Sequence, residues 1–330
     1  MGSDPTEWAS ADATLVDAVS TGIDHSPTVL DDVDANGGLW VLRGPRRVGK
    51  SVALKRTAFR FCSRNDPMRL IYLAVDGFLA KDLRRAFTLG RQITAAAGDA
   101  PRLWLIDEIT SVDGWELLVK ELRDNTALSN DGVVLTGSSA AGLQDAVRAL
   151  GPGRTKVAQP FRTLLPMTFA EVLAATDAGV PELEPVTPDR LQSPEVAVAV
   201  ERMSVFVDDF DLLWQRFMET GGFPRAVGDH YRHGDVGEVF ARDLSAWLTT
   251  DVTPGDSAES STELIRVLHE RTASPLDVKN IADQLHTTRE RLRVRLERLV
   301  ATFGAMWCHQ VSDEGVRLAG RSRSCTWQIP

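Results

Sequence analysis

A loop framed by two glycines and ending in a lysine and a hydroxyl residue is the stretch of this sequence best suited to chemistry. Residues 44–51 read Gly-Pro-Arg-Arg-Val-Gly-Lys-Ser and match the pattern G-x-x-x-x-G-K-[ST] in full. In such a loop backbone N–H groups turn toward phosphate oxygens, the lysine reaches the β- and γ-phosphates, and the hydroxyl ligates Mg²⁺. The pattern predicts a nucleoside triphosphate site formed by Gly44, Pro45, Arg46, Arg47, Val48, Gly49, Lys50, Ser51 and Val52.

Two neighbouring carboxylates form a second group of reactive side chains. Residues 101–109 read Pro-Arg-Leu-Trp-Leu-Ile-Asp-Glu-Ile, an apolar run that ends in Asp107 and Glu108. After a phosphate loop, Asp107 is expected to hold Mg²⁺ together with Ser51. Glu108 is expected to act as the general base that polarises the attacking water. The alternative is a strand that ends in acids for solubility, and the preceding loop argues against it.

Short apolar runs alternate with segments of helical spacing, which predicts an α/β fold with a parallel sheet. Strands are expected at 39–42, 68–76, 101–109 and 132–140, and helices at about 11–21, from 50 onward, at 81–96 and at 113–125. The loop therefore joins a strand to a helix, as its pattern requires, which disfavours an incidental glycine turn. We expect the end of 132–140 beside Asp107, with Thr136 or Ser138 as a sensor of the γ-phosphate. A Ser/Thr-rich turn is the alternative for both.

Several motifs in order resemble the archaeal and bacterial AAA-type P-loop ATPases over residues 36–310. They read RGPRRVGKS, LWLIDEI, DGWELLVKELRDN, VVLTGSSAAGL, GRTKVAQPFRTLLPMTFAEVL and ETGGFPRAV. The resemblance implies an AAA-like core with a central parallel sheet, ATP as the nucleotide, and a winged-helix domain after the core. It also implies a phosphate-sensing role for Arg154, for which a salt-bridged loop arginine is the alternative.

Many proteins of this family continue into a domain similar to restriction endonucleases, and we expect no such function here. A nuclease core needs an acidic-x-Lys triplet, and the sequence has one, Asp277-Val278-Lys279, inside a predicted helix.

Proline-rich and polar breakpoints divide the chain into further parts. The predicted domains are a helical lead-in at 1–35, a P-loop ATPase core at 36–175, a linker or insertion at 176–195, a helical segment at 196–255 with helices at 196–220 and 225–248, and a winged-helix domain at 256–330 with helices at 262–271, 276–285 and 289–303 and strands at 306–311 and 315–318.

Arg291, Arg295 and Arg298 share one flank of the third winged-helix helix and have no acidic residue three or four positions away. Such an edge suits phosphate contacts, which makes duplex DNA a candidate partner of residues 262–319. Residues 261–330 carry 11 basic and 8 acidic side chains in a chain of net charge −9. This asymmetry is a mild indication of nucleic-acid contact at that end. A solvated face, or docking onto the acidic part of the chain, is the alternative.

Composition limits the class of protein. The 330 residues are 43% hydrophobic and 25% charged, as in soluble globular proteins. No apolar run approaches the ~18 residues of a membrane span, and three cysteines without paired spacing suit a reducing cytoplasm.

Together with the motifs above, these observations predict Mg²⁺-dependent ATP hydrolysis that is coupled to a domain movement. We expect the protein in the cytoplasm, and the prediction is compatible with an oligomer or a partner protein. The alternative is a nucleotide-gated DNA-binding regulator with little turnover. An intact Glu108 favours hydrolysis.

Overall fold

The computed structural model describes residues 10–137, 155–183, 186–271, 274, 276–308 and 324–326. The chain divides into two compact units. The first contains Met1–Val16, Pro27–Leu165 and Asp243–Ile329, and the second contains Asp17–Ser26 and Pro166–Arg242.

A five-stranded parallel sheet with strand order β2-β3-β4-β1-β5 forms the centre of the first unit. Its inner strands are apolar on both faces, as expected for a parallel sheet that is covered on both sides. Four of the five strands were predicted, and β5 was missed because it is short, polar and at the edge. The strands are β1 Leu39–Arg43, β2 Leu70–Ala74, β3 Leu103–Asp107, β4 Gly132–Thr136 and β5 Phe161–Thr163.

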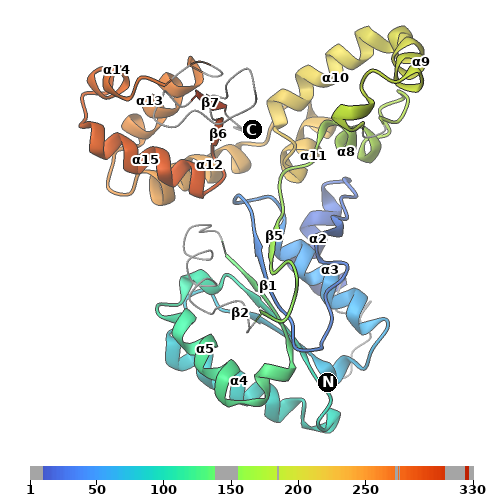
Figure 1. Cartoon of the computed structure of the whole chain (residues 1–330), viewed down its shortest axis with the longest axis vertical. Coiled ribbons are helices and arrows are strands. Elements are labelled where there is room, and N and C mark those ends of the chain that lie inside the picture. The colour runs from blue at the N-terminus through green and yellow to red at the C-terminus, as the bar shows by residue number, and fades with distance from the viewer. Residues whose placement is uncertain are drawn as a thin grey trace. The chain divides into compact units, whose positions relative to one another are not determined.

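Helices cover both faces of this sheet (Figure 1). Alternate strand residues such as Val41 and Ile106 belong to one hydrophobic core with Phe87 and Leu118 of α4 and α5. The opposite face is covered by α3, whose Leu54 is fully buried. The predicted helices of this part are confirmed as α2 Ala13–Ser20, α3 Lys50–Cys62, α4 Ala80–Ile93 and α5 Trp115–Asn125.

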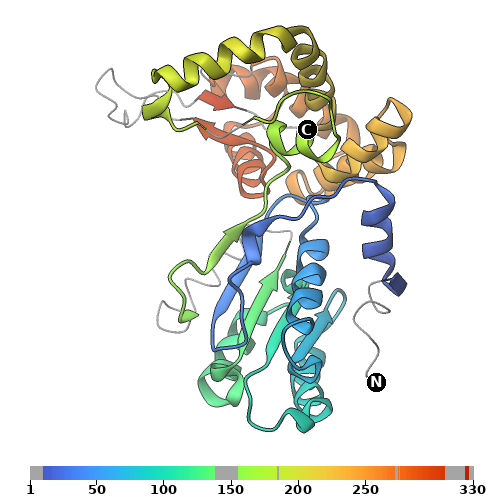
Figure 2. The same ribbon diagram turned by 90° about the vertical axis from the view of Figure 1, so that its right-hand side faces the viewer.

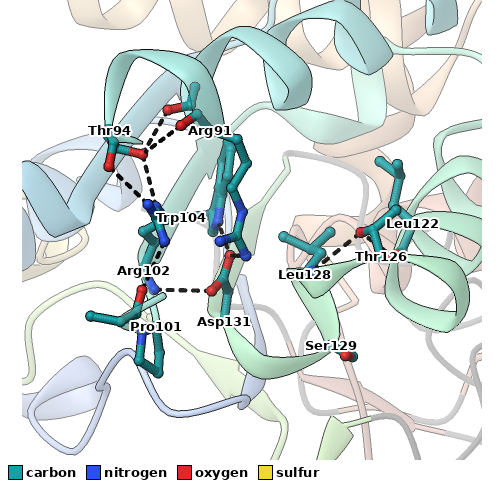
Figure 3. Close-up of polar contacts among 12 residues, drawn as sticks. Arg91, Thr94, Pro101, Arg102, Trp104, Leu122, Thr126, Leu128, Ser129 and Asp131 are labelled. Carbon is teal, nitrogen blue, oxygen red and sulfur yellow. Dashed lines mark hydrogen bonds and ion pairs between the residues drawn. The ribbon is translucent and has the colours of Figure 1, made fainter. Parts of the chain in front are cut away.

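A buried polar network closes the sheet at the amino ends of β3 and β4 (Figure 3). The carboxylate of Asp131 accepts hydrogen bonds from the Arg102 backbone N–H at 3.0 Å and the Trp104 Nε1–H at 2.8 Å. The guanidinium of Arg91 forms an ion pair with it, and Arg102 Nε donates to the Thr94 hydroxyl at 2.8 Å. The buried charge is thus paired and hydrogen-bonded, which is what its burial requires.

The carboxyl-terminal part of the first unit has a hydrophobic core of its own, to which Leu264, Ile281, Leu292 and Leu296 contribute. The predicted three helices are confirmed, and an antiparallel strand pair follows them. The second predicted strand, 315–318, lies outside the described residues, and the strand that pairs with β6 comes later in the chain. The elements are α12 Glu238–Trp247, whose first residues belong to the second unit, a π-helical turn Leu248–Val252, α13 Ala258–His269, α14 Val278–Gln284, α15 Arg289–Ala301, β6 Met306–Cys308 and β7 Ser324–Thr326.

The second unit is helical (Figure 2). Its helices are α8 Phe169–Ala175, α9 Pro194–Met203, α10 Val207–Thr220 and α11 Pro224–His233. The helix predicted at 225–248 is interrupted because Gly234 adopts a left-handed φ of 76° that ends α11. Among the residues that the structure describes, no helix combines the length and the apolar character needed to cross a bilayer.

Candidate nucleotide-binding site

The predicted phosphate loop connects β1 to α3, and its two glycines are required by its geometry. Gly49 has a left-handed φ of 97°, a conformation that costs a glycine little. At Gly44 a Cβ atom would lie 2.1 Å from the Leu164 carbonyl oxygen, so a side chain cannot fit there. Both glycines of the sequence pattern therefore have a structural reason in this fold.

The first turn of α3 is suited to binding an anion. Lys50 and Ser51 are its first two residues and Val52 is the third, and no side chain caps its amino end. The first N–H groups of a helix have no partner within the helix, and together with the helix dipole they favour phosphate. Val48, within the loop, is buried.

Lys50 is held against the loop itself. Its side chain is 6% exposed, and Nζ donates to the carbonyl oxygens of Gly44 at 3.0 Å and Pro45 at 2.9 Å. Burial lowers the pKa of the Lys50 ammonium to about 8, and the carboxylates of Glu108 and Asp107 act in the opposite direction. An ammonium has three donors, so one remains for a phosphate oxygen. Phosphate charge would also favour the protonated form.

The two arginines of the loop have acidic partners near the carboxyl-terminal helices of the same unit. Arg46 Nε lies 3.0 Å from Asp251 Oδ2, and the Arg47 guanidinium pairs with Asp243. Both arginine side chains are about half exposed. These partners are some two hundred residues away in the sequence, and no spacing rule could have indicated them.

Asp107 and Glu108 lie where the sequence predicted, at the carboxyl end of β3 and beside β4. Asp107 is 6% exposed, and its Oδ1 accepts a hydrogen bond of 2.5 Å from the Thr136 hydroxyl. The same hydroxyl accepts the Glu108 backbone N–H at 3.1 Å. Thr136 is fully buried and its one donor is used by Asp107 in this structure. Its hydroxyl thus links the two acidic residues, and a function as γ-phosphate sensor stays a prediction.

Glu108 has an unusual backbone conformation for a residue with a side chain. Its φ of 58° lies in the left-handed region, which is uncommon outside glycine, asparagine and aspartate. Such strain persists only where the surroundings enforce it, and it is concentrated at functional sites. Here the hydrogen bond from Glu108 to Thr136 contributes to holding it.

A tyrosine that the sequence analysis missed supports the second oxygen of Asp107. The Tyr72 hydroxyl, on β2, donates to Asp107 Oδ2 at 2.9 Å. Burial, and next the charge of Asp107, raise the pKa of Tyr72, so the phenol keeps its proton. Lys55, on α3, lies with its Nζ 5.6 Å from the centre of the Tyr72 ring. Lys55 lies four residues after Ser51 in a chain with six lysines, and this spacing could have indicated a residue of the site.

Ser51 and Asp107 are the residues predicted to supply oxygen ligands to a divalent cation. Magnesium prefers oxygen donors and usually takes one or two from the protein, the others coming from phosphates and water. The donor types therefore fit Mg²⁺. In the described ranges, no three His, Cys, Asp or Glu side chains gather as a metal site. The predicted site residues Ser138 and Arg154 lie outside the described residues.

The three arginines of α15 do not form one exposed, unpaired edge. Arg295 is 5% exposed and pairs with the buried Asp256, and the exposed Arg291 pairs with the same carboxylate. Arg298 is exposed in the last turn of the helix. The prediction that these arginines lack acidic partners is wrong for Arg291 and Arg295, because their partner is more than thirty residues distant in sequence.

Comparison with protein families finds a match, and it covers the stretch that carries the loop and the two acidic residues. Residues 36–173 match the AAA domain. With the parallel sheet described above, this match identifies an AAA-type P-loop core. Comparison with curated proteins finds no match.

Solved structures show distant likeness. The RuvB Holliday junction branch migration motor of Thermotoga maritima is 13% identical, with 86% of this chain and 85% of that chain covered and a TM-score of 0.38. The Aeropyrum pernix ORC2 protein in ADPNP-ADP complexes is 11% identical, with coverages of 97% and 91% and a TM-score of 0.48. AMPPCP-bound DnaA from Aquifex aeolicus is 12% identical, with coverages of 91% and 89% and a TM-score of 0.30. At these TM-scores the likeness assigns neither a site nor an activity.

Proposed function

We propose that the AAA domain binds ATP with Mg²⁺ and hydrolyses it to ADP and phosphate. One observation carries the proposal: a complete phosphate loop and an Asp-Glu pair lie at the carboxyl ends of strands of one parallel sheet. Strand β4 alone separates the strand of the loop, β1, from the strand of the acids, β3. Ligands of α/β proteins bind at this end of the sheet.

The residues divide the chemistry among them. Lys50 and the N–H groups of the loop bind the β- and γ-phosphates, and Ser51 and Asp107 hold Mg²⁺, which neutralises charge that develops on the phosphates. Glu108 accepts a proton from the attacking water as general base. The strained backbone of Glu108 and its hydrogen bond to Thr136 support a fixed position for this carboxylate.

We further propose that nucleotide binding is coupled to the carboxyl-terminal helices. The ion pairs of Arg46 with Asp251 and of Arg47 with Asp243 support this coupling. A triphosphate in the loop attracts the same two arginines and therefore competes with the two aspartates. Limited proteolysis of the carboxyl-terminal part, with and without ATP, tests the coupling. A cleavage pattern that ATP does not change would contradict it.

We also propose that residues 256–330 form a winged-helix domain that contacts DNA. The arrangement of three helices followed by an antiparallel strand pair, with Arg291 and Arg298 exposed on the third helix, supports it. The pairing of Arg291 and Arg295 with Asp256 reduces the number of free cations available to phosphates. We therefore expect weak, salt-sensitive binding that does not depend strongly on sequence.

Phosphate release by the purified chain, measured with Mg²⁺ or EDTA and with or without duplex DNA, tests the function. Lys50→Ala removes the cation that reaches the phosphates, so we expect nucleotide binding to be lost. Lys81→Ala, at an exposed position of α4, is the matched control and should behave as the parent. Parent-like ATP affinity in folded Lys50→Ala would overturn the nucleotide site. ATP binding without turnover would instead favour the nucleotide-gated regulator.

A further inference from the structure

We infer that Tyr72 and Lys55 are positioning residues that fix the two Mg²⁺ ligands, Ser51 and Asp107, relative to each other, and that Asp12 belongs to the same support. The inference rests on the proposed function and adds three residues to its site. They come from three separate elements: β2, α3 and the segment that enters α2.

The first contact is the one that orients Asp107. Its two carboxylate oxygens each accept one hydroxyl, from Tyr72 at 2.9 Å and from Thr136 at 2.5 Å. Two hydrogen bonds from opposite neighbouring strands prevent the carboxylate from rotating. Each oxygen still has lone-pair capacity for a cation. Partners of this kind typically tune metal affinity by fixing the ligand.

The second contact is the one that fixes Tyr72. Lys55 is 8% exposed, and its ammonium lies over the Tyr72 ring, where a cation is attracted to the ring face. Ser51 and Lys55 are four residues apart on α3 and therefore lie on the same side of the helix. A continuous line of contacts thus runs from the helix that carries Ser51, through Lys55 and Tyr72, to Asp107.

The third contact holds Lys55 in place. Its Nζ is 2.8 Å from both carboxylate oxygens of Asp12 and 2.7 Å from the Thr14 hydroxyl. Asp12 is itself fixed, because Oδ1 accepts the backbone N–H groups of Thr14 and Leu15 at 3.0 Å and caps α2. All three donors of the ammonium are used within the amino-terminal segment. Lys55 is therefore not a phosphate ligand, and its function is to hold Tyr72.

The test measures the part of nucleotide affinity that depends on the metal. A fluorescent, non-hydrolysable ATP analogue is titrated into the parent and into Tyr72→Phe, once with Mg²⁺ and once with EDTA. Tyr72→Phe keeps the ring beneath Lys55 and removes only the hydroxyl. We expect affinity in EDTA to be unchanged and the gain on adding Mg²⁺ to fall by about 10-fold. A role confined to stability would lower the melting temperature without this split.

Tyr231→Phe is the matched control, since Tyr231 is the other tyrosine of the chain and is 61% exposed. A Mg²⁺ gain in Tyr72→Phe equal to that of the parent overturns this inference and leaves the proposed function intact. A parent that binds no nucleotide overturns both. If Tyr72→Phe does not stay folded, Asp12→Asn is measured in the same way, because it removes the counter-charge of Lys55 and leaves the Tyr72 hydroxyl in place. An unchanged Mg²⁺ gain there again overturns the inference.

Discussion

Two buried carboxylates lie at opposite ends of the same sheet, and their partners differ in kind. Asp131, at the amino end, is paired with the guanidinium of Arg91 and receives two further N–H donors. Asp107, at the carboxyl end, receives two neutral hydroxyl groups. A carboxylate compensated by arginine has its charge satisfied within the protein. One held only by hydroxyl groups is oriented and still has charge to offer a cation.

The kind of partner distinguishes these carboxylates, whereas burial does not. Asp256 belongs with Asp131, because its side chain is 4% exposed and pairs with two arginines. Asp107 is as deeply buried as these two, and Lys50 interacts with it only at longer range. An isolated buried charge is costly in a protein. A nearby cation, supplied with the nucleotide, would relieve that cost at Asp107.

The largest effect is expected beside Asp107, at Glu108. Glu108→Gln keeps the shape and the backbone hydrogen bond but cannot accept a proton, so hydrolysis should slow by about 10²–10⁴-fold. ATP affinity with Mg²⁺ should be retained. Single-turnover phosphate release measures the effect, and Glu116→Gln on α5 serves as the control. Turnover at the parent rate would mean that the base lies elsewhere.

The comparison itself is tested by exchanging each carboxylate for its amide. Asp131→Asn removes the charge that pairs with Arg91 and replaces one accepting oxygen by an NH₂ donor that faces other N–H donors, so the free energy of unfolding should fall by about 2–4 kcal/mol. The Mg²⁺ dependence of nucleotide binding should not change. Asp107→Asn should do the opposite: it should weaken the Mg²⁺ response and change stability little. Urea unfolding and Mg²⁺ titration of both variants provide the measurement.

Asp113→Asn, at an exposed position six residues beyond Asp107, is the control for both variants. Equal loss of stability in Asp107→Asn and Asp131→Asn, with no change in Mg²⁺ response, would erase the distinction between the two ends of the sheet.

The smallest effect is expected in α15, where the buried, paired Arg295 can be compared with the exposed Arg298. Arg295→Ala should lower the melting temperature, because it leaves Asp256 short of one partner. It should leave the salt dependence of DNA binding unchanged. Arg298→Ala should spare stability and, if the exposed guanidinium contacts a phosphate, flatten the log–log salt slope by about 0.9. A flatter slope for Arg295→Ala would restore that buried arginine as a DNA contact.

The sequence predicted the sheet and the positions of its acids because both follow from local patterns. The strand-loop-helix around Lys50 and the apolar run before Asp107 each fit within a dozen residues. What it could not predict were contacts between distant elements, such as Tyr72 with Asp107 or Arg295 with Asp256. The sequence around Tyr72, in an apolar strand, and around Asp256, in a polar loop, does not show whether either residue has a hydrogen-bond or ion-pair partner. Thr136 was predicted beside Asp107, but its hydrogen bonds to both acidic residues could not be inferred from the sequence.

The π-helical turn Leu248–Val252 sets the relative direction of the two aspartates that pair with the phosphate-loop arginines. In an uninterrupted α-helix, Asp243 and Asp251 would point about 80° apart around the axis, since each residue advances it by about 100°. The π turn, closed by the Thr253 N–H to the Leu248 carbonyl at 2.9 Å, places more residues in one turn and reduces this divergence. Loss of one residue here would leave an α-helix with the two aspartates seven positions apart, about 20° from a whole number of turns, so both would still face the phosphate loop. A substitution that converted the π turn to α-helix without shortening the chain would instead point them about 80° apart and draw one aspartate away from its arginine.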